Sequence, residues 1–318
     1  MMAPPPCRGF TLTELLVALA LGISSLACIY SLLVVSHRSV ISTRAHQQLQ
    51  QSGRLALRIL QQDIAQAGFF AELTGTDLAT TVRATVPLAA AEDCRGGGSN
   101  NGSYPNDAGF FRVLWATAEP DAYEIGCARS AVPDSDLLQL KRLDGVAINQ
   151  GYDPSEIYMA LNAQEGHFFV GIDGPPWLAQ GRQYRYRHRL YFVALNSAQQ
   201  PTLYMHDLSA SGMARASALV EGVEAIEFLM GVDRTGDGVV DQYVRPDDVA
   251  ESWWDQSSQA RIVAIQIQVL LVSLQPDPTF DSSTLRIAMA SGERTVKNDG
   301  RRRLLLSAML ILHNAQHG

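Results

Sequence analysis

The fold is decided by Gly9-Phe10-Thr11-Leu12-Thr13-Glu14-Leu15-Leu16 and by the apolar run that continues to Val35. Leu15 through Val35 is a run of 21 residues without a charged side chain. As an α-helix this run would be about 31 Å long, enough to cross the hydrocarbon core of a bilayer. The carboxylate of Glu14 stands just inside the apolar segment, where a charge costs about 2.5–3.5 kcal/mol at the bilayer centre. Because such a charge normally has a partner, Glu14 is the first candidate functional residue.

The flanks of this segment do not fit an ordinary secretory signal. Such a signal has a basic start and a small-residue cleavage site after its apolar stretch. Here the small residue, Gly9, comes before the stretch. A lipoprotein signal ending at Cys28 also fits badly, because Ser25 stands where a branched apolar residue is expected. A plain membrane anchor with an incidental Glu14 is the remaining simple alternative.

The run from Arg8 to Leu16 resembles the type III signal of type IV pilins and type II secretion pseudopilins, a short basic leader ending in Gly followed by Phe-Thr-Leu-x-Glu-Leu-Leu. The resemblance implies that a prepilin peptidase cleaves between Gly9 and Phe10 and that the new amine of Phe10 is N-methylated. Glu14 would then attract the terminal amine of a neighbouring subunit during assembly. In a low dielectric, such a carboxylate and ammonium attract strongly, and each relieves the other's burial.

Composition excludes some classes of function. The chain has 318 residues, of which 47% are hydrophobic and 18% charged, so it is globular rather than disordered. A net charge of −7 argues against a nucleic-acid binder, which needs clustered Lys and Arg to neutralise phosphates. There is no Walker loop, no zinc-ligand spacing of histidines and no Ser–His or Cys–His motif in a known context, so nothing indicates an enzyme.

Cysteine usage predicts one disulfide. Cys7 lies in the leader and Cys28 in the apolar run. Cys94 and Cys127 remain in the exported part, where an oxidising periplasm allows them to pair. Metal binding by this pair is not indicated, because neither has a Cys or His at ligand spacing.

After Val35 the helical pattern continues but becomes amphipathic. Apolar residues recur at steps of three and four up to Ala67, and Gly68 then stops the helix. We therefore expect one helix over residues 10–68, with 10–35 in the membrane and 36–68 packed on a soluble domain. Gly22 and Gly53 are candidate points of bending. The apolar positions are Leu57, Leu60, Ile64 and Ala67, and the polar ones are Arg54, Arg58, Gln61, Gln62 and Asp63.

Residues 69–318 are expected to form a β-rich head. Alternating patterns predict strands, whereas residues 71–182 are weakly patterned and form a candidate insertion or subdomain. In Tyr184–Val193, arginines alternate with aromatic residues. The acidic total charge favours a solvated arginine face over a binding patch for nucleic acid or an acidic partner. The triplet Arg301–Arg303 is likewise expected to be a solvated strand start. The predicted strands are Asp136–Arg142, Tyr184–Val193, Pro201–Met205, Val263–Leu271 and Arg301–Leu312.

Two further features are candidate sites. Asp233, Thr235, Asp237 and Asp241 take the first, third, fifth and ninth places of a calcium loop, but the twelfth place is Val244, so its bidentate Glu is missing. The favoured alternative is an Asp-Gly hairpin turn. Ca²⁺ is the only cofactor considered. Exposed tryptophans often anchor partners, which makes Trp253-Trp254 a candidate contact.

Several segments resemble PilW-type minor pilins. These are Gly53–Phe69, Arg189–Tyr204, Val220–Asp241 and the two closing strands. The resemblance implies an α+β, pilin-like fold with a long N-terminal helix on an antiparallel-sheet head. It also implies a non-enzymatic minor pilin that helps to initiate the type IV pilus and sits at or near its tip. The implied partners are other minor pilins, the major pilin, prepilin peptidase, the inner-membrane assembly platform and a tip adhesin.

The same resemblance implies a location. The chain would be held in the inner membrane with its head in the periplasm and would then enter the extracellular pilus. Three alternatives remain open at this point. They are a J-type pseudopilin of a type II secretion system, a signal-anchored tip adhesin that binds a surface ligand, and a periplasmic hydrolase.

Overall fold

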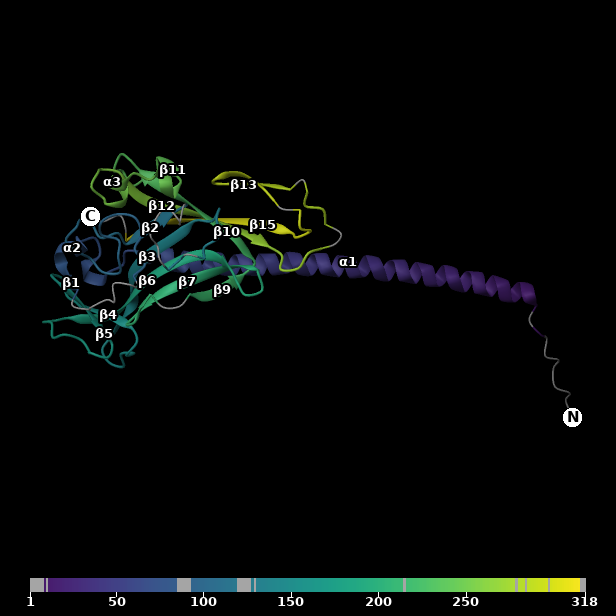
Figure 1. The fold of residues 1–318 in the computed structure, drawn as a ribbon, viewed down its shortest axis with the longest axis horizontal. Helices are drawn as coiled ribbons and strands as arrows, with labels where there is room; N and C mark the ends of the chain where they lie inside the picture. Colours follow the sequence, from purple (N-terminus) through teal and green to yellow (C-terminus); the bar gives the residue numbers. More distant parts are fainter. Residues whose placement is uncertain are drawn as a thin grey trace.

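A computed structural model describes residues 9, 11–84, 93–118, 127–128, 130–213, 216–277, 280–283, 285–296 and 298–314. Phe10, one of the predicted processing residues, lies outside this set. A single long helix, α1 (Leu12–Ile64), carries a β-rich head around its C-terminal half, while its N-terminal half projects away from the head (Figure 1). The predicted α+β fold with a long N-terminal helix is confirmed.

The ends of α1 follow from its sequence. Thr11 is the N-cap, and Thr11 and Glu14 form a capping box that satisfies backbone N–H groups of the first turn. At the other end, the helix stops at Ile64, slightly before the expected Ala67. A turn then leads to Gly68, whose φ of +75° suits glycine and whose N–H donates to the Lys141 carbonyl at 3.0 Å. This hydrogen bond joins the turn after α1 directly to the sheet.

The two halves of α1 have different surroundings. Leu12–Ser36 is long and apolar enough to cross a membrane, and none of it is buried in the head. In the second half, the apolar stripe that includes Leu60 and Ile64 is buried in the main core. A Cβ added at Gly53 would lie 2.5 Å from Leu306 Cδ1 and would clash. Gly53 therefore lets the helix approach the sheet closely, a role that differs from the expected bending.

The first sheet against α1 has four antiparallel strands in the order β11 (Gln242–Val244), β10 (Val223–Asp233), β12 (Arg261–Val272) and β15 (Arg303–Ile311). It contains both predicted closing strands. Alternate residues of β12, from Ile265 to Leu271, are fully buried in the same core as Leu60. Because successive side chains of a strand point to opposite faces of the sheet, these buried alternate residues form the face that packs against the helix. A small hairpin of β13 (Arg286–Met289) and β14 (Gly292–Thr295) lies beside it (Figure 1).

The second sheet has nine strands and is centred on the long strand β6 (Arg182–Leu195), which pairs with β3, β4 and β7. Helix α1 contacts strands of both sheets and lies between them. The weakly patterned region 71–182 supplies β1–β5 and shares this sheet with β6 and β7. The remaining strands are β1 (Val82–Ala84), β2 (Leu114–Thr117), β3 (Leu137–Ile148), β4 (Ile157–Leu161), β5 (Gly166–Val170), β7 (Pro201–Ser209), β8 (Gly212–Met213) and β9 (Ser217–Glu221).

Short helices complete the head at the end far from the projecting helix. They are η1 (Ala71–Leu73), α2 (Leu78–Thr81), η3 (Pro246–Asp248) and α3 (Glu251–Trp254).

A buried carboxyl group joins the two sheets. Asp136, immediately before β3, donates its backbone N–H to the Ile226 carbonyl at 2.8 Å and accepts the Phe228 N–H on Oδ2 at 2.7 Å. Both partners lie in β10. Arg245 binds Asp136 and the equally buried Glu227, each at 3.2 Å. Burial raises the pKa of Asp136 to about 7, and Arg245 only partly opposes this.

We expect Asp136→Asn to weaken the pH dependence of head stability. The folded pKa of about 7 lies above the ordinary value of 3.8, so the folded state holds this proton longer. The carboxyl therefore lowers the unfolding free energy by up to about 1.4 kcal/mol per unit as pH rises from about 4 to 7. Denaturant unfolding at pH 5 and pH 7.5 measures the difference, with exposed Asp173→Asn as control. An unchanged pH dependence would show that Asp136 does not titrate here.

Candidate functional site

Glu14 stands at the exposed tip of α1. Its Oε2 accepts hydrogen bonds from Thr11 N at 2.9 Å and Thr11 Oγ1 at 2.8 Å. Its own N–H donates to Thr11 Oγ1 at 3.3 Å. Within the described part of the chain, Oε1 has no hydrogen-bond partner. One oxygen of the carboxylate is therefore held by Thr11, while the other is available to a cation from another molecule.

Behind Glu14, the helix presents apolar side chains on all sides. Over Leu12–Ser36 the large aliphatic residues other than Val34 are more than half exposed. Such a continuous apolar surface is not stable in water, and it needs lipid or other helices around it. The most exposed apolar side chains are Leu12, Leu21, Leu26, Tyr30, Leu32 and Val35.

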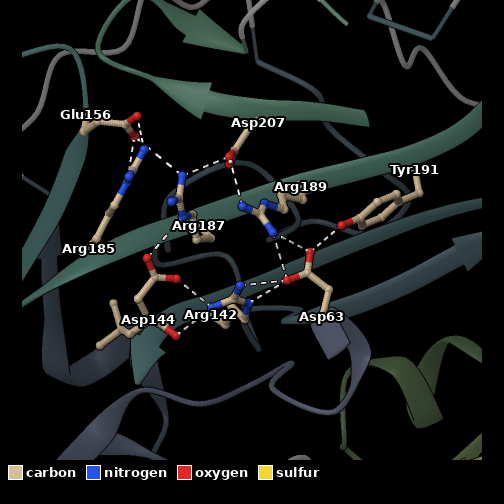
Figure 2. Close-up of polar contacts among 10 residues, drawn as sticks. Asp63, Arg142, Asp144, Glu156, Arg185, Arg187, Arg189, Tyr191 and Asp207 are labelled. Atoms are coloured by element: carbon tan, nitrogen blue, oxygen red, sulfur yellow. Dashed lines mark hydrogen bonds and ion pairs between the residues drawn. The ribbon is translucent and has the colours of Figure 1, made fainter. Parts of the chain in front are cut away.

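A second charged site fixes the far end of α1 to the head. Asp63, only 3% exposed, is surrounded by donors from β3 and β6 (Figure 2). Arg142 donates to its Oδ1 from Nε at 2.9 Å and from Nη2 at 2.7 Å. Arg189 Nη1 lies 2.9 Å from both carboxylate oxygens, and the Tyr191 hydroxyl donates to Oδ2 at 2.5 Å. One helix carboxylate thus ties together two neighbouring strands.

The arginine row of β6 continues this network outward. Arg187 contacts Asp144 at 3.3 Å and Asp207 at 2.9 Å, and Arg189 also reaches Asp207 at 3.2 Å. Arg185 pairs with Glu156 (Figure 2). The side chains of Arg185, Arg187 and Arg189 are only 27%, 12% and 18% exposed. The prediction of a solvated arginine face is therefore wrong, because acidic residues distant in sequence cover the row.

The other face of this strand agrees with its sequence pattern. Tyr184, Tyr186 and His188 are buried. Together, four arginines and four carboxylates form the network, so its formal charges balance. Its members are Arg142, Arg185, Arg187, Arg189, Asp63, Asp144, Glu156 and Asp207. Nothing in the local sequence around Asp63 distinguished it from the solvated residues of the helix.

The electrostatics of Asp63 agree with this geometry. Burial raises the pKa of its carboxyl, but the charges of Arg189 and Arg142 and the Tyr191 hydrogen bond outweigh burial and lower the pKa below its ordinary value. The carboxylate form is therefore the one that the folded state holds.

The Arg301–Arg303 triplet is also paired. Arg303 is 2% exposed at its side chain and binds Glu224 at 2.7 Å and Asp299 at 2.9 Å. Arg302 binds Asp277 at 2.9 Å and lies over the Phe280 ring. The expected solvated strand start is thus wrong for these two residues, which fasten the beginning of β15 to its neighbours.

The four candidate calcium ligands lie at the end of β10 and in the loop that leads to β11. Asp233 is buried, and both its oxygens accept backbone N–H groups at 2.7–3.0 Å. Thr235 directs its hydroxyl to Asp233 at 3.3 Å, and Asp237 and Asp241 also accept backbone N–H groups. The backbone donors are Thr235, Gly236 and Gly238 for Asp233, Val239 for Asp237 and Arg234 for Asp241. This geometry favours the Asp-Gly turn, since a cation would compete with these donors.

In the part of the chain that the structure describes, no group of three or more His, Cys, Asp or Glu side chains could hold a metal ion. We therefore expect the melting temperature of the protein to be the same in Ca²⁺ and in a chelator. Thermal unfolding in both conditions checks this. A chelator-induced fall in melting temperature that Asp237→Asn removes would instead support the calcium alternative.

The predicted disulfide is present. Cys94 and Cys127 are bonded, with Cα atoms 5.8 Å apart, and Cys28 is free on the exposed part of α1. Trp253 and Trp254 do not form an exposed anchor, because Trp254 is 5% exposed and Trp253 packs against the main core. The exposed tryptophan is Trp177, at 91%, which follows two prolines in a loop that the sequence had marked only as a turn.

We expect Asp63→Asn to destabilise the protein by about 3–5 kcal/mol, because it leaves two arginines without their buried counter-charge. The adjacent exposed Gln62→Ala serves as control. Because the folded pKa of Asp63 is lowered, its contribution is present above the ordinary pKa and is lost as pH falls through the folded value. The two proteins should therefore approach each other in stability at low pH. A loss below about 1 kcal/mol at neutral pH would contradict a tight anchor.

Comparison with known families matches two parts of the chain. Residues 190–314 match the family model for type IV pilus-assembly protein W, from within β6 to just beyond β15. Residues 5–27 match the prokaryotic N-terminal methylation motif, which includes Gly9 and Glu14. The comparisons with curated proteins and with solved structures find no significant match. The chain therefore carries a prepilin-type methylation motif and a PilW domain, a combination that is consistent with a PilW-type pilin of the type IV pilus system.

Proposed function

We propose that this protein is a minor pilin that helps to initiate type IV pilus assembly and sits at or near the pilus tip with other minor pilins. The observation that carries this proposal is the exposed apolar half of α1, headed by Glu14 and joined without a break to a folded head. A subunit built in this way can enter a bundle of similar helices while its head remains outside the bundle.

Processing prepares the helix for this role. Prepilin peptidase removes residues 1–9 and leaves Phe10 as the new N-terminus, with its amine methylated. Before assembly, Leu12–Ser36 lies in the inner membrane and the head lies in the periplasm. The assembly platform then receives the helix, together with those of other minor pilins and of the major pilin.

Glu14 selects the register in which two helices meet. Its Oε1 is free to pair with the terminal amine of a neighbouring subunit, while Thr11 holds Oε2. A carboxylate–ammonium pair at 4 Å gains about 4 kcal/mol at an effective dielectric of about 20. Apolar contacts between helices have little directional preference, so this pair supplies the axial alignment that they lack.

The Asp63 anchor makes the head follow the helix. Because α1 is one helix from the membrane segment into the core, its axial position in the bundle determines the position of the head surface. The outward-facing surfaces of the head then determine which partners bind. The adhesin alternative loses its predicted contact, since Trp253 and Trp254 pack on the core.

We expect Glu14→Gln to reduce surface piliation by about tenfold or more when it replaces the wild-type chain in a piliated host. The amide still accepts the Thr11 hydrogen bonds but has no charge for a neighbouring amine, and about 1.4 kcal/mol already corresponds to tenfold. Glu14→Asp, which keeps the charge, should retain part of the activity. The measurements are counts of sheared pili and immunoblots of this chain in the pilus and membrane fractions.

The alternatives predict different outcomes of the same experiment. Normal piliation with Glu14→Gln, from a processed and membrane-inserted protein, contradicts the amine-pairing role. Normal piliation without the chain, accompanied by loss of protein secretion, indicates a J-type pseudopilin. Normal piliation accompanied by loss of surface attachment indicates an adhesin.

A further inference from the structure

A lysine lies fully buried in the head without a carboxylate partner. Lys141, in β3, is 0% exposed. Its Nζ lies 2.6 Å from the Arg112 carbonyl oxygen and 2.7 Å from Asn101 Oδ1, and it stands 4.6 Å from the centre of the Phe111 ring. No ion pair joins it to any acidic side chain that the structure describes. Buried lysines of this kind normally lose their charge.

The burial of this amine and its two hydrogen-bond acceptors both indicate that it is neutral. Burial lowers the pKa of Lys141 well below its usual range; the charge of Asp93 only partly opposes this, and the nearby Arg112 guanidinium lowers the pKa further. A neutral amine also has two N–H groups, which matches the two acceptors present. Its lone pair then has no proton, and a desolvated neutral lysine is a nucleophile.

The carboxamide of Asn101 is held firmly beside this amine. Asn101 is 2% exposed, and its Nδ2 donates to the Gly97 carbonyl at 2.9 Å, which turns Oδ1 towards Lys141. With a C=O bond of about 1.23 Å, the amide carbon lies at most about 3.9 Å from Nζ. A Cβ on Gly96 would lie 2.4 Å from Asn101 Nδ2, so only glycine lets the loop fold so tightly here.

We propose that Lys141 and Asn101 join in an intramolecular isopeptide bond. Lys141 Nζ attacks Asn101 Cγ and forms a new C–N bond. The bond from Cγ to Nδ2 breaks, and Nδ2 leaves as ammonia with a proton that comes from Nζ. One amine and one primary amide give one secondary amide and ammonia, so the step needs no oxidant, metal or cofactor.

A buried carboxylate lies next to the pair. Asp93 is 4% exposed at its side chain, and its Oδ1 accepts the Ser103 hydroxyl at 2.6 Å. A Cβ on Gly102, the residue after Asn101, would lie 2.8 Å from Asp93 Oδ2. We assign to Asp93, whose charge acts on the Lys141 amine, the transfer of the proton between the two nitrogens.

The bond would complete a covalent attachment that the disulfide begins. The segment 93–113 contains no strand, yet it bonds to Gln139 of β3 and to Tyr186 and His188 of β6. The Cys94–Cys127 bridge fixes its beginning, and Asn101 would fix its middle directly to β3. This attachment is independent of the proposed role in assembly and can be tested without it.

The test is mass spectrometry of the full chain, exported in a piliated host, purified in detergent and reduced before proteolysis. We expect the intact mass to be lower by one ammonia than the processed, methylated sequence requires. Peptides that contain Asn101 and Lys141 should appear as one branched product that resists reduction, with trypsin failing to cleave after Lys141. An unlinked Lys141 peptide in full yield would overturn the proposal.

Asn101-Gly102 can also lose ammonia by closing to a succinimide, which has the same mass change. The branched peptide separates the two, because a succinimide links no second peptide. Lys141→Met should abolish the branched product, whereas loss of ammonia that persists in this variant comes from the succinimide. If Lys141→Met does not fold, the wild-type peptide map alone decides, since the branched product is either present or absent there.

Discussion

The structure depends on one carboxylate, that of Asp63, and on the three side chains that donate hydrogen bonds to it. It lies at the end of a helix that is otherwise attached by apolar contacts with little directional preference. Arg142 and Arg189 come from neighbouring strands, and both orient towards this one group (Figure 2). Buried ion pairs contribute little net stability compared with apolar packing, but removing one member is costly. We therefore infer that this site determines the geometry of the helix–head junction, whereas apolar packing supplies most of its net stability.

The two sheets hold α1 by different means. Against the four-stranded sheet, Gly53 allows close apolar packing on Leu306 and Leu271. Against the nine-stranded sheet, Asp63 fixes the helix by charge and hydrogen bonds. The combination prevents both sliding and rotation, since the charged contact has one register whereas the apolar contact supplies area. When the membrane helix is displaced, a head that is fixed in this way moves with it, and so does the outer surface of the head.

Local signals in the sequence were sufficient for much of this architecture. The uncharged run up to Val35, Glu14 and the alternating strands were visible from spacing alone, and Cys94 and Cys127 were the only pair left for a disulfide. The arginine row could not be interpreted from the sequence. Its partners, among them Asp63 and Asp207, are far away along the chain, and burial by distant segments has no local pattern. The region 71–182 was weakly patterned because several of its strands, such as β1 with three residues, are too short to show alternation.

A double-mutant cycle tests the central role of Asp63 most directly. The unfolding free energies of wild type, Asp63→Asn, Arg189→Gln and the double variant would be measured in the full chain at neutral pH. If the carboxylate and the guanidinium act as one buried unit, the double variant loses less than the sum of the single losses, with a coupling of about 2 kcal/mol or more. Additive losses would contradict this account, because they would mean that Asp63 and Arg189 stabilise the head independently.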